Sequence, residues 1–225
     1  MVPTRLRVVA LTGVLTSFVL LCASQVSWSQ TDKLQGLPNF GRVSDSLFRG
    51  AQPTAAGYRV LRDRGISIIV NFRDETDEIA AEKRQVESLG MEYIGIPWNG
   101  YEEPSNSQVA QFLDLVRANQ DARIFVHCKA GADRTGVMVA AYRIALERKA
   151  VTDAVAEMHQ YHYHWLFLPH LERYVKSLPH LLQSETVFSA YAPKLPTAPV
   201  ENPFAAAPAA ASTGPISAPG AGRER

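Results

Sequence analysis

Apolar and polar positions follow two different periods along residues 31–190. Short apolar runs that are rich in β-branched residues and bounded by turn residues predict strands, whereas apolar positions recurring every three or four residues predict helices. Strands are expected at 46–49, 66–72, 91–96 and 123–127. Helices are expected from Thr54 to about 64, at 76–89, from Ser105 or Asn106 to about 118, and at about 134–148, 152–162 and 170–178.

This alternation of strands and helices predicts an α/β fold, with a mainly parallel central sheet flanked by helices. Turn residues support the boundaries: Gly65 and Gly90 follow the first two helices, and Pro97 ends a strand. Ligands of such sheets bind at the carboxyl ends of the strands. Functional residues are therefore expected in the segments that follow the strands.

The N-terminal segment has a different composition from the rest of the chain. Residues 1–29 contain no Asp or Glu, and the apolar run 8–21 follows Arg5 and Arg7. This pattern is typical of a secretory signal peptide, and the run is shorter than the ~20 residues that span a bilayer. We expect export to the periplasm or the medium, with cleavage after Ser24 or Ser29. An anchor formed by residues 8–24 and lipid attachment at Cys22 are alternatives.

The C-terminal segment, residues 191–225, holds seven of the 14 prolines and ten alanines. Such a composition offers little apolar area for a core and removes backbone donors, so it predicts a disordered tail. The expected organisation is thus a signal peptide at 1–29, one catalytic domain at 31–190 and a tail at 191–225.

The charge balance excludes one class of function. The chain has 23 Lys and Arg against 22 Asp and Glu, a formal net charge of +1, and so lacks the basic excess of nucleic-acid binders. Any anionic ligand must be captured locally. The two cysteines, Cys22 and Cys128, cannot form a disulfide framework, and cleavage of the N-terminus would leave Cys128 as the only thiol.

The segment after the strand at 123–127 carries the candidate chemistry. It reads His127-Cys128-Lys129-Ala130-Gly131-Ala132-Asp133-Arg134-Thr135-Gly136 and leads directly into a helix. Backbone amides of a tight loop at a helix N-terminus bind tetrahedral anions, and Gly131 allows backbone conformations that other residues avoid. The planar fork of Arg134 suits two phosphate oxygens. The same positive field favours a thiolate at Cys128, which could then attack phosphorus in line.

The pattern His-Cys-x5-Arg-Thr-Gly resembles the signature of the cysteine-dependent protein-tyrosine-phosphatase superfamily. Residues 47–53 and 70–75 are similar to elements of its atypical dual-specificity branch in bacteria, fungi and plants, and the likeness covers roughly residues 40–180. The resemblance implies a phosphatase that forms a phosphocysteine on Cys128, hydrolyses it with water and needs no metal or other cofactor.

The resemblance also implies a role for each residue of the motif. Arg134 would bind phosphate, Thr135 would stabilise the departing thiolate, and His127 would support the loop by hydrogen bonds. The phosphate-binding amides would come from Lys129, Ala130, Gly131, Ala132 and Asp133. Three other interpretations stay open: a buried structural cysteine beside a capping arginine, a rhodanese-type sulfurtransferase, and a phosphate-binding pseudophosphatase without turnover.

The general acid is where the sequence departs from the family pattern. Common members carry an Asp on the loop after the strand that precedes the signature strand, but residues 96–104 contain none. A positioned proton donor is worth roughly 10²–10⁴ in rate. The candidates are Asp133, which has a counterpart in myotubularin-like phosphatases, Glu102 or Glu103 on the loop, and Asp74 at another strand end. The alternative role for Asp133 is a salt bridge that orients Arg134.

The substrate class stays open between phosphotyrosine, phosphoserine or phosphothreonine proteins and inositol phosphates. Lys129 after the nucleophile resembles lipid phosphatases of the phosphatase-and-tensin-homologue type, which favours phosphoinositides or soluble inositol phosphates. His159, His162 and His164 suggest a metal site, but no Cys or carboxylate completes a set at a suitable spacing, so rim or packing roles are preferred. We expect a monomer that contacts membranes only through an uncleaved N-terminus.

Overall fold

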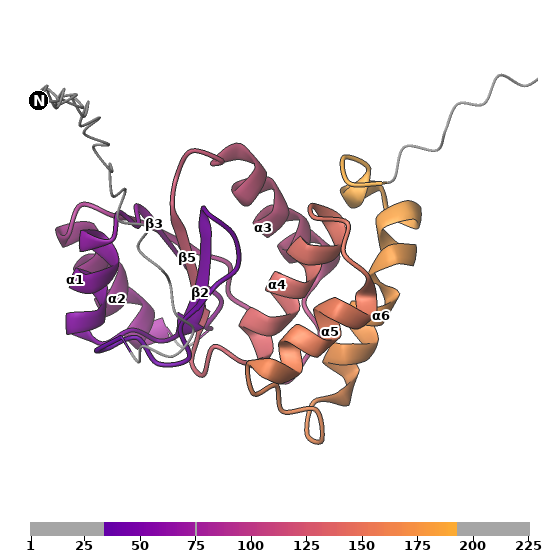
Figure 1. Cartoon of the computed structure of the whole chain (residues 1–225), viewed down its shortest axis with the longest axis horizontal. Coiled ribbons are helices and arrows are strands. Elements are labelled where there is room, and N and C mark those ends of the chain that lie inside the picture. Colours follow the sequence, from indigo (N-terminus) through magenta and orange to yellow (C-terminus); the bar gives the residue numbers. More distant parts are fainter. Residues whose placement is uncertain (1–33, 75, 193–225) are drawn as a thin grey trace, which may run out of the picture.

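A five-stranded sheet lies at the centre of the computed structural model, which describes residues 34–74 and 76–192 (Figure 1). The strands are β1 Gly41–Arg42, β2 Leu47–Ala51, β3 Ile68–Asn71, β4 Glu92–Gly95 and β5 Ile124–Cys128, in the spatial order β1-β2-β5-β3-β4. All neighbours pair in parallel except β1 and β2, which are antiparallel. The predicted α/β fold with a mainly parallel sheet is confirmed.

Helices cover both faces of this sheet. They are α1 Ala55–Asp63, α2 Thr76–Ser88, α3 Asn106–Ala118, α4 Asp133–Ala145, α5 Val151–Gln160 and α6 Pro169–Ser184, followed by the 3-10 helix η1 Thr186–Phe188. Figure 1 shows α1 and α2 on one side of the sheet and α3 to α6 on the other. Each side has its own apolar core; Phe125 packs with α1 and α2, whereas Val126 packs with α3 to α6. This alternation is what a strand buried on both faces requires.

Local capping fixes the helix starts that the sequence predicts. The Thr54 side chain accepts a hydrogen bond from the Gly57 N–H at the start of α1. Ser105 and Gln108 form a reciprocal capping box at the start of α3. Because α3 begins there, the loop between β4 and α3 has fixed ends on either side of residues 96–104.

One strand and one helix differ most from the sequence-based expectation, and the other elements agree within a few residues. The short strand β1 was not predicted, because two residues give no periodicity to read. Helix α6 runs to Ser184 rather than 178 and includes Pro179. Its buried positions Leu178 and Leu182 continue the apolar stripe past the proline, so packing outweighs the lost backbone hydrogen bond.

The folded domain also extends past residue 190. Tyr191 is buried in the core and its hydroxyl donates to Asp114 Oδ1 at 2.5 Å, so the first residue of the predicted tail belongs to the domain. The predicted signal peptide and the remainder of the tail lie outside the described residues. Within 34–74 and 76–192, no helix has both the length and the apolar character that crossing a bilayer requires.

Candidate active site

The sheet register brings the strand ends together around Cys128. Cys128 ends the central strand β5 and lies opposite Ala51 at the end of β2, while Asn71 at the end of β3 pairs with His127. Residues 129–132 then lead into α4, whose first residue is Asp133. We name residues 128–134 the Cys loop. Cys128 is a free cysteine, and the residue is buried with 3% of its surface exposed.

Three consecutive carbonyls of the Cys loop are held from its outer side. The Gln52 N–H donates to Lys129 O at 3.2 Å, Asn39 Nδ2 donates to Ala130 O at 3.1 Å, and Arg49 Nη2 donates to Gly131 O at 2.9 Å. In a trans peptide the N–H points opposite to the C=O. The amides that follow these carbonyls therefore face the inner side of the loop. Inward-facing amides of this kind suit a bound anion, and we name this inner side of the loop the cradle.

Gly131 is required by the geometry of this cradle. Its φ of 69° lies in the left-handed region, as the sequence led us to expect. A Cβ at this position would lie 2.3 Å from the Gly50 carbonyl carbon and 2.5 Å from the Ala51 amide nitrogen. The end of β2 thus packs against the Cys loop too closely for any side chain.

Arg49 places a buried positive charge beneath the Cys loop. Its side chain is fully buried and its guanidinium carbon lies 3.8 Å from the centre of the Tyr161 ring. Burial lowers the pKa of Arg49 to about 10, and the nearby Glu157 carboxylate opposes that shift. No role for Arg49 was predicted from the sequence. An arginine that ends a short apolar strand could have indicated a buried charge with a specific partner.

Arg134 is oriented by the loops that follow β3 and β4. Its Nη1 donates to Asp74 Oδ1 at 2.7 Å and to Trp98 O at 3.2 Å. Gly100 lies over the guanidinium, since a Cβ there would be 3.0 Å from Arg134 Nε. Asp74, one of the three acid candidates, is therefore engaged as a partner of Arg134.

Thr135 and His127 adjoin the two ends of the Cys loop in the chain. Thr135 is fully buried, and within the described part of the chain its Oγ1 has no hydrogen-bond partner. His127 is also fully buried; its Nδ1 lies 3.3 Å from Cys128 O, and its Nε2 lies 2.7 Å from Glu82 Oε1. His127 thus links the backbone of the nucleophile to a carboxylate on α2.

Glu82 is a functional candidate that the sequence analysis missed. Its carboxylate accepts hydrogen bonds from Tyr58 Oη at 2.5 Å and Asn71 Nδ2 at 2.7 Å, besides the contact with His127. Burial tends to raise the pKa of Glu82, but the hydrogen bond and charge of His127, together with hydrogen bonds from Tyr58 and Gln52, lower that pKa below its ordinary value of 4.5. Glu82 lies four residues before the buried Val86 and therefore on the same face of α2. This spacing could have identified Glu82 as a buried carboxylate.

Asp133 lies at the first turn of α4 and contacts the connection between α5 and α6. Its Oδ1 accepts from the His164 N–H at 2.9 Å, and its Oδ2 lies 2.9 Å from His164 Nδ1. The structure therefore brings one of the three histidines, His164, to the Cys loop. His159 instead contacts Glu172 at 3.2 Å.

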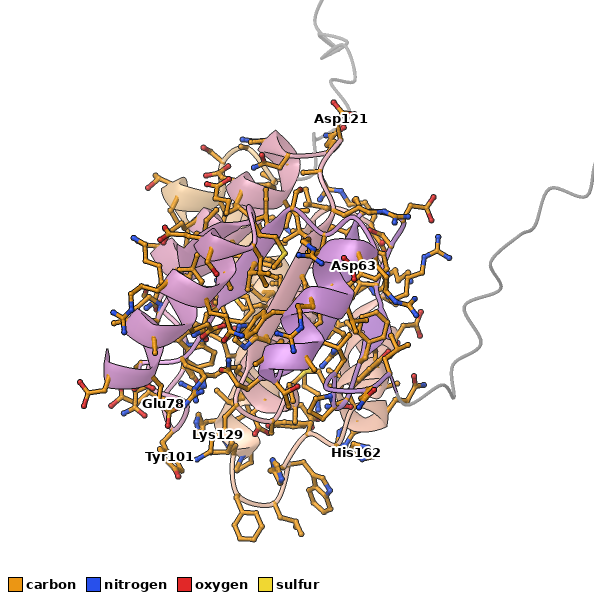
Figure 2. The ribbon with its side chains drawn as sticks, turned by 90° about the vertical axis from the view of Figure 1, so that its left-hand side faces the viewer. Asp63, Glu78, Tyr101, Asp121, Lys129 and His162 are labelled. Carbon is orange, nitrogen blue, oxygen red and sulfur yellow. The ribbon has the colours of Figure 1, made fainter. Side chains whose placement is uncertain are left out.

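The remaining candidates are exposed residues on the Cys loop and on the loop that follows β4, which together we call the rim of the site. Glu102 and Glu103 are exposed on the connection between β4 and α3, and Lys129 is exposed on the Cys loop. Figure 2 shows Tyr101 and Lys129 toward the lower end of the molecule and Asp121 at its upper end. Nowhere in 34–74 or 76–192 do three His, Cys, Asp or Glu side chains come together as a metal site would require.

This geometry agrees with the comparison to known protein families. The family described as DSP-PTPase phosphatase fused to NAD+ kinase matches residues 32–165. The chain belongs to this family. Its membership confirms the resemblance to the dual-specificity branch, and the match spans the Cys loop, both upstream elements and His164.

Individual relatives agree with the family. The dual specificity protein phosphatase TpbA of Pseudomonas aeruginosa PAO1 is 26% identical over 120 residues, which is 53% of each chain. Dual specificity protein phosphatase 26 of Bos taurus is 26% identical over 122 residues, 52% of this chain and 56% of that protein. The chain spans about half the length of these curated relatives.

Solved structures share the fold. TpbA in complex with pTyr superposes with a TM-score of 0.56 at 20% identity, covering 68% of this chain and 90% of that one. The core catalytic domain of the PP-IP phosphatase SIW14 from S. cerevisiae gives 0.54 at 16% identity, covering 65% and 92%.

Proposed function

We propose that the chain is a cysteine-dependent phosphatase of the dual-specificity type, with Cys128 as nucleophile and Arg134 as the phosphate-binding arginine. The observation that carries the proposal is the outward bonding of three consecutive carbonyls in the Cys loop. It turns the amides of the loop inward at the N-terminus of α4, where the helix dipole adds positive potential. Family membership supports the same chemistry.

The reaction follows from this arrangement in two steps. The Cys128 thiolate attacks phosphorus, forming the P–S bond while the P–O bond to the leaving group breaks. The loop amides and Arg134 stabilise the charge on the equatorial oxygens. Water then attacks phosphorus, the P–S bond breaks, and inorganic phosphate leaves. Thr135, whose buried hydroxyl has no hydrogen-bond partner in the described chain, would donate to the departing thiolate.

Asp133 is our proposed general acid. It would protonate the leaving oxygen in the first step and take a proton from water in the second. Asp133 directly precedes Arg134 in the chain, and its contacts with His164 hold the carboxylate at the first turn of α4 beside the Cys loop. Asp74 is occupied by Arg134, and Glu102 and Glu103 stand on the exposed loop.

Phosphate monoesters are the proposed substrates, carried by phosphoproteins or inositol phosphates. TpbA was crystallised with pTyr, and SIW14 is named a PP-IP phosphatase, so both kinds of substrate occur among proteins with this fold. Lys129 beside the nucleophile adds a second positive charge for substrates with several phosphates.

Substitution of the two central residues tests the proposal. Cys128→Ser should abolish turnover of a small aryl phosphate while still binding vanadate, because a serine hydroxyl gives no accessible anion here. Arg134→Lys should cost roughly 10²–10⁴ in kcat/KM, since a point charge cannot replace a bidentate fork. A phosphocysteine trapped on wild-type protein supports turnover over mere phosphate binding. Normal turnover by Cys128→Ser, or transfer of sulfur from thiosulfate in place of phosphatase activity, would refute it.

A further inference from the structure

The connection between α5 and α6, residues 161–168, has a buried base and an apolar tip. Tyr163 and Leu168 are buried and joined by a hydrogen bond from the Tyr163 hydroxyl to the Leu168 carbonyl. The backbone N–H groups of Phe167 and Leu168 both donate to His164 O at 3.0 Å, which closes a tight turn. We name residues 165–167 the apolar tip. The turn presents its three side chains to solvent, with exposed fractions of 52% for Trp165, 67% for Leu166 and 80% for Phe167.

This tip stands beside the candidate active site. Residue 164, directly before it, holds the carboxylate of Asp133. In Figure 1 the connection between α5 and α6 projects beyond the rest of the domain, and Figure 2 places His162 at the same end as Lys129 and Tyr101. Tyr101 is itself 82% exposed. Exposed large apolar side chains therefore lie at the same end of the molecule as Lys129 of the Cys loop.

A protruding apolar turn of this kind is suited to insertion into the surface of a lipid bilayer. Trp, Leu and Phe on a fixed turn insert into the boundary between headgroups and acyl chains, where aromatic residues are enriched. A peptide ligand would need a concave apolar groove, whereas these three side chains point outward from a convex turn. Because Glu102 and Glu103 share this rim with Lys129, insertion rather than attraction to anionic lipid would supply the binding.

The N-terminal chain makes contact with the same face. Asn39 donates to Ala130 O of the Cys loop and to Tyr161 O, and the described chain begins five residues earlier at Leu34. The apolar run 8–21 is separated from Leu34 by residues 22–33. Twelve residues span at most about 40 Å. In the anchored alternative, where residues 8–24 stay in a bilayer, the tip would lie within reach of that bilayer; after cleavage, the tip alone would make the membrane contact.

We propose that residues 165–167 insert into a lipid interface, and that the Cys loop acts on phosphate monoesters carried by lipid headgroups. This inference rests on the proposed phosphatase function and names a substrate class for the same site. Insertion would bring a headgroup phosphate to Cys128 from the membrane side, past Lys129 and His164.

The test compares full-length variants with one matched control. Leu166→Ser combined with Phe167→Ser removes most of the exposed apolar area of the tip and spares His164. Val187→Ser alters another exposed apolar residue, which lies on η1 beyond the far end of α6. The probes are phosphatidylcholine vesicles, with and without phosphatidylglycerol, that carry dioleoyl phosphatidylinositol phosphate. The soluble reference substrate is the dihexanoyl form of the same lipid.

We expect the double variant to bind both kinds of vesicle at least about tenfold more weakly than wild type and to lose vesicle turnover in proportion. Its turnover of the dihexanoyl lipid should change less than twofold, and Val187→Ser should match wild type throughout. Wild-type Trp emission should shift to the blue on vesicles, and Trp165→Phe should bind while losing that shift. All variants share one N-terminus, so these differences report the tip.

The outcomes separate this inference from the proposed function. If wild type turns over the soluble lipid through Cys128 but the double variant binds vesicles and acts on them like wild type, only the lipid inference fails. If the double variant instead slows a phosphopeptide with apolar flanks and leaves vesicle binding unchanged, the tip contacts peptides and the inference is wrong. Absence of any Cys128-dependent turnover would refute the proposed function. In that case the difference in Trp emission between wild type and Trp165→Phe on vesicles would still show whether the tip inserts.

Discussion

Proton delivery depends on single carboxylates around the Cys loop, and leaving groups of different acidity distinguish them. Asp133→Asn should slow hydrolysis of alkyl phosphates by about 10²–10⁴, because an alkoxide needs a proton as it departs. Phosphates of acidic phenols leave without help, so their kcat/KM should change far less. Steady-state kinetics of the purified variant on both substrate types provide the measurement.

Variants on the rim serve as controls for that assignment. Glu102→Gln and Glu103→Gln should leave both substrate types nearly unchanged, since these side chains are exposed on the loop after β4. His164→Gln should reduce alkyl phosphate turnover by less than Asp133→Asn does, because it removes the imidazole contact but keeps the backbone N–H of residue 164 that also donates to Asp133. If a glutamate variant shows the leaving-group dependence while Asp133→Asn slows both substrates alike, Asp133 only positions its neighbours.

Residues of the site differ in how well the sequence reveals them. The Cys loop is contiguous, so Cys128, Gly131 and Arg134 could be recognised from their spacing alone. Asn39 and Arg49 donate to Ala130 O and Gly131 O, which are 91 and 82 residues away in the chain. Every residue has a backbone carbonyl, so the sequence does not indicate which carbonyl a distant side chain will bind. Their roles become visible only once the sheet register is known.

At the level of elements, α2 is joined to the active site through Glu82. The pKa of Glu82 is below 4.5 in the folded protein, so the unfolded chain binds the proton first as pH falls. Its stabilising contribution is therefore fully present above about pH 4.5 and is lost as pH drops through the lower folded value. Glu82→Gln should reduce the free energy of unfolding at pH 7 by about 1–3 kcal/mol.

The same variant should also flatten the acid limb of the stability curve. Urea unfolding at a series of pH values from neutral to strongly acidic measures both effects. Glu87→Gln is a suitable control, because Glu87 is exposed on the same helix. Curves for Glu82→Gln and wild type that stay parallel down to the lowest pH would show that the buried carboxylate does not couple α2 to His127.

Helix α6 shows where sequence patterns misplace an element. Caps, glycines and β-branched runs marked most boundaries within a few residues, since each has a local physical cause. Pro179 suggested an end because it cannot donate a backbone hydrogen bond, yet buried Leu178 and Leu182 hold the helix together on both sides. Tertiary packing decided this boundary, and packing is not readable from a local window.

Removing this proline should stabilise the domain. Pro179→Ala restores a backbone donor within α6, and the expected gain in the free energy of unfolding is about 1–2 kcal/mol after the entropy of the freed chain is counted. Chemical denaturation of both proteins gives the difference. A loss of stability would mean that the ring of Pro179 packs against its surroundings more favourably than a regular helical turn would.

On the scale of the whole molecule, the two cores and the active site meet at β5. This strand packs Phe125 into one core and Val126 into the other, and its last residue is Cys128. Helix α4 continues from the Cys loop and is buried along nearly its full length. Cys128 therefore stands where the two cores meet, while the groups around it come from the ends of β2, β3 and β4.

Cys128 is the one cysteine of the predicted catalytic domain, residues 31–190, and this leads to a redox prediction. We propose that the N-terminal segment directs export and is removed after Ser24 or Ser29, which would also remove Cys22. An activated thiolate outside the cytoplasm meets oxidants without cytosolic thiol buffers. Peroxide should therefore inactivate the mature enzyme through sulfenic acid at Cys128, with no internal disulfide. Phosphate in the cradle should protect it, because an anion bound by the loop amides would cover the sulfur of this buried residue.

Intact-mass analysis of protein from the extracytoplasmic fraction measures both parts of this prediction. The expected mass lacks residues 1–24 or 1–29, gains one oxygen after brief peroxide treatment, and gains none when phosphate is present. Cys128→Ser should gain no oxygen under the same conditions and serves as the control. Recovery only from the cytoplasm with residues 1–29 intact would overturn the export proposal. A Cys22–Cys128 disulfide after peroxide would overturn the redox prediction, because it requires both thiols in one chain and a Cys loop open enough for the second to enter.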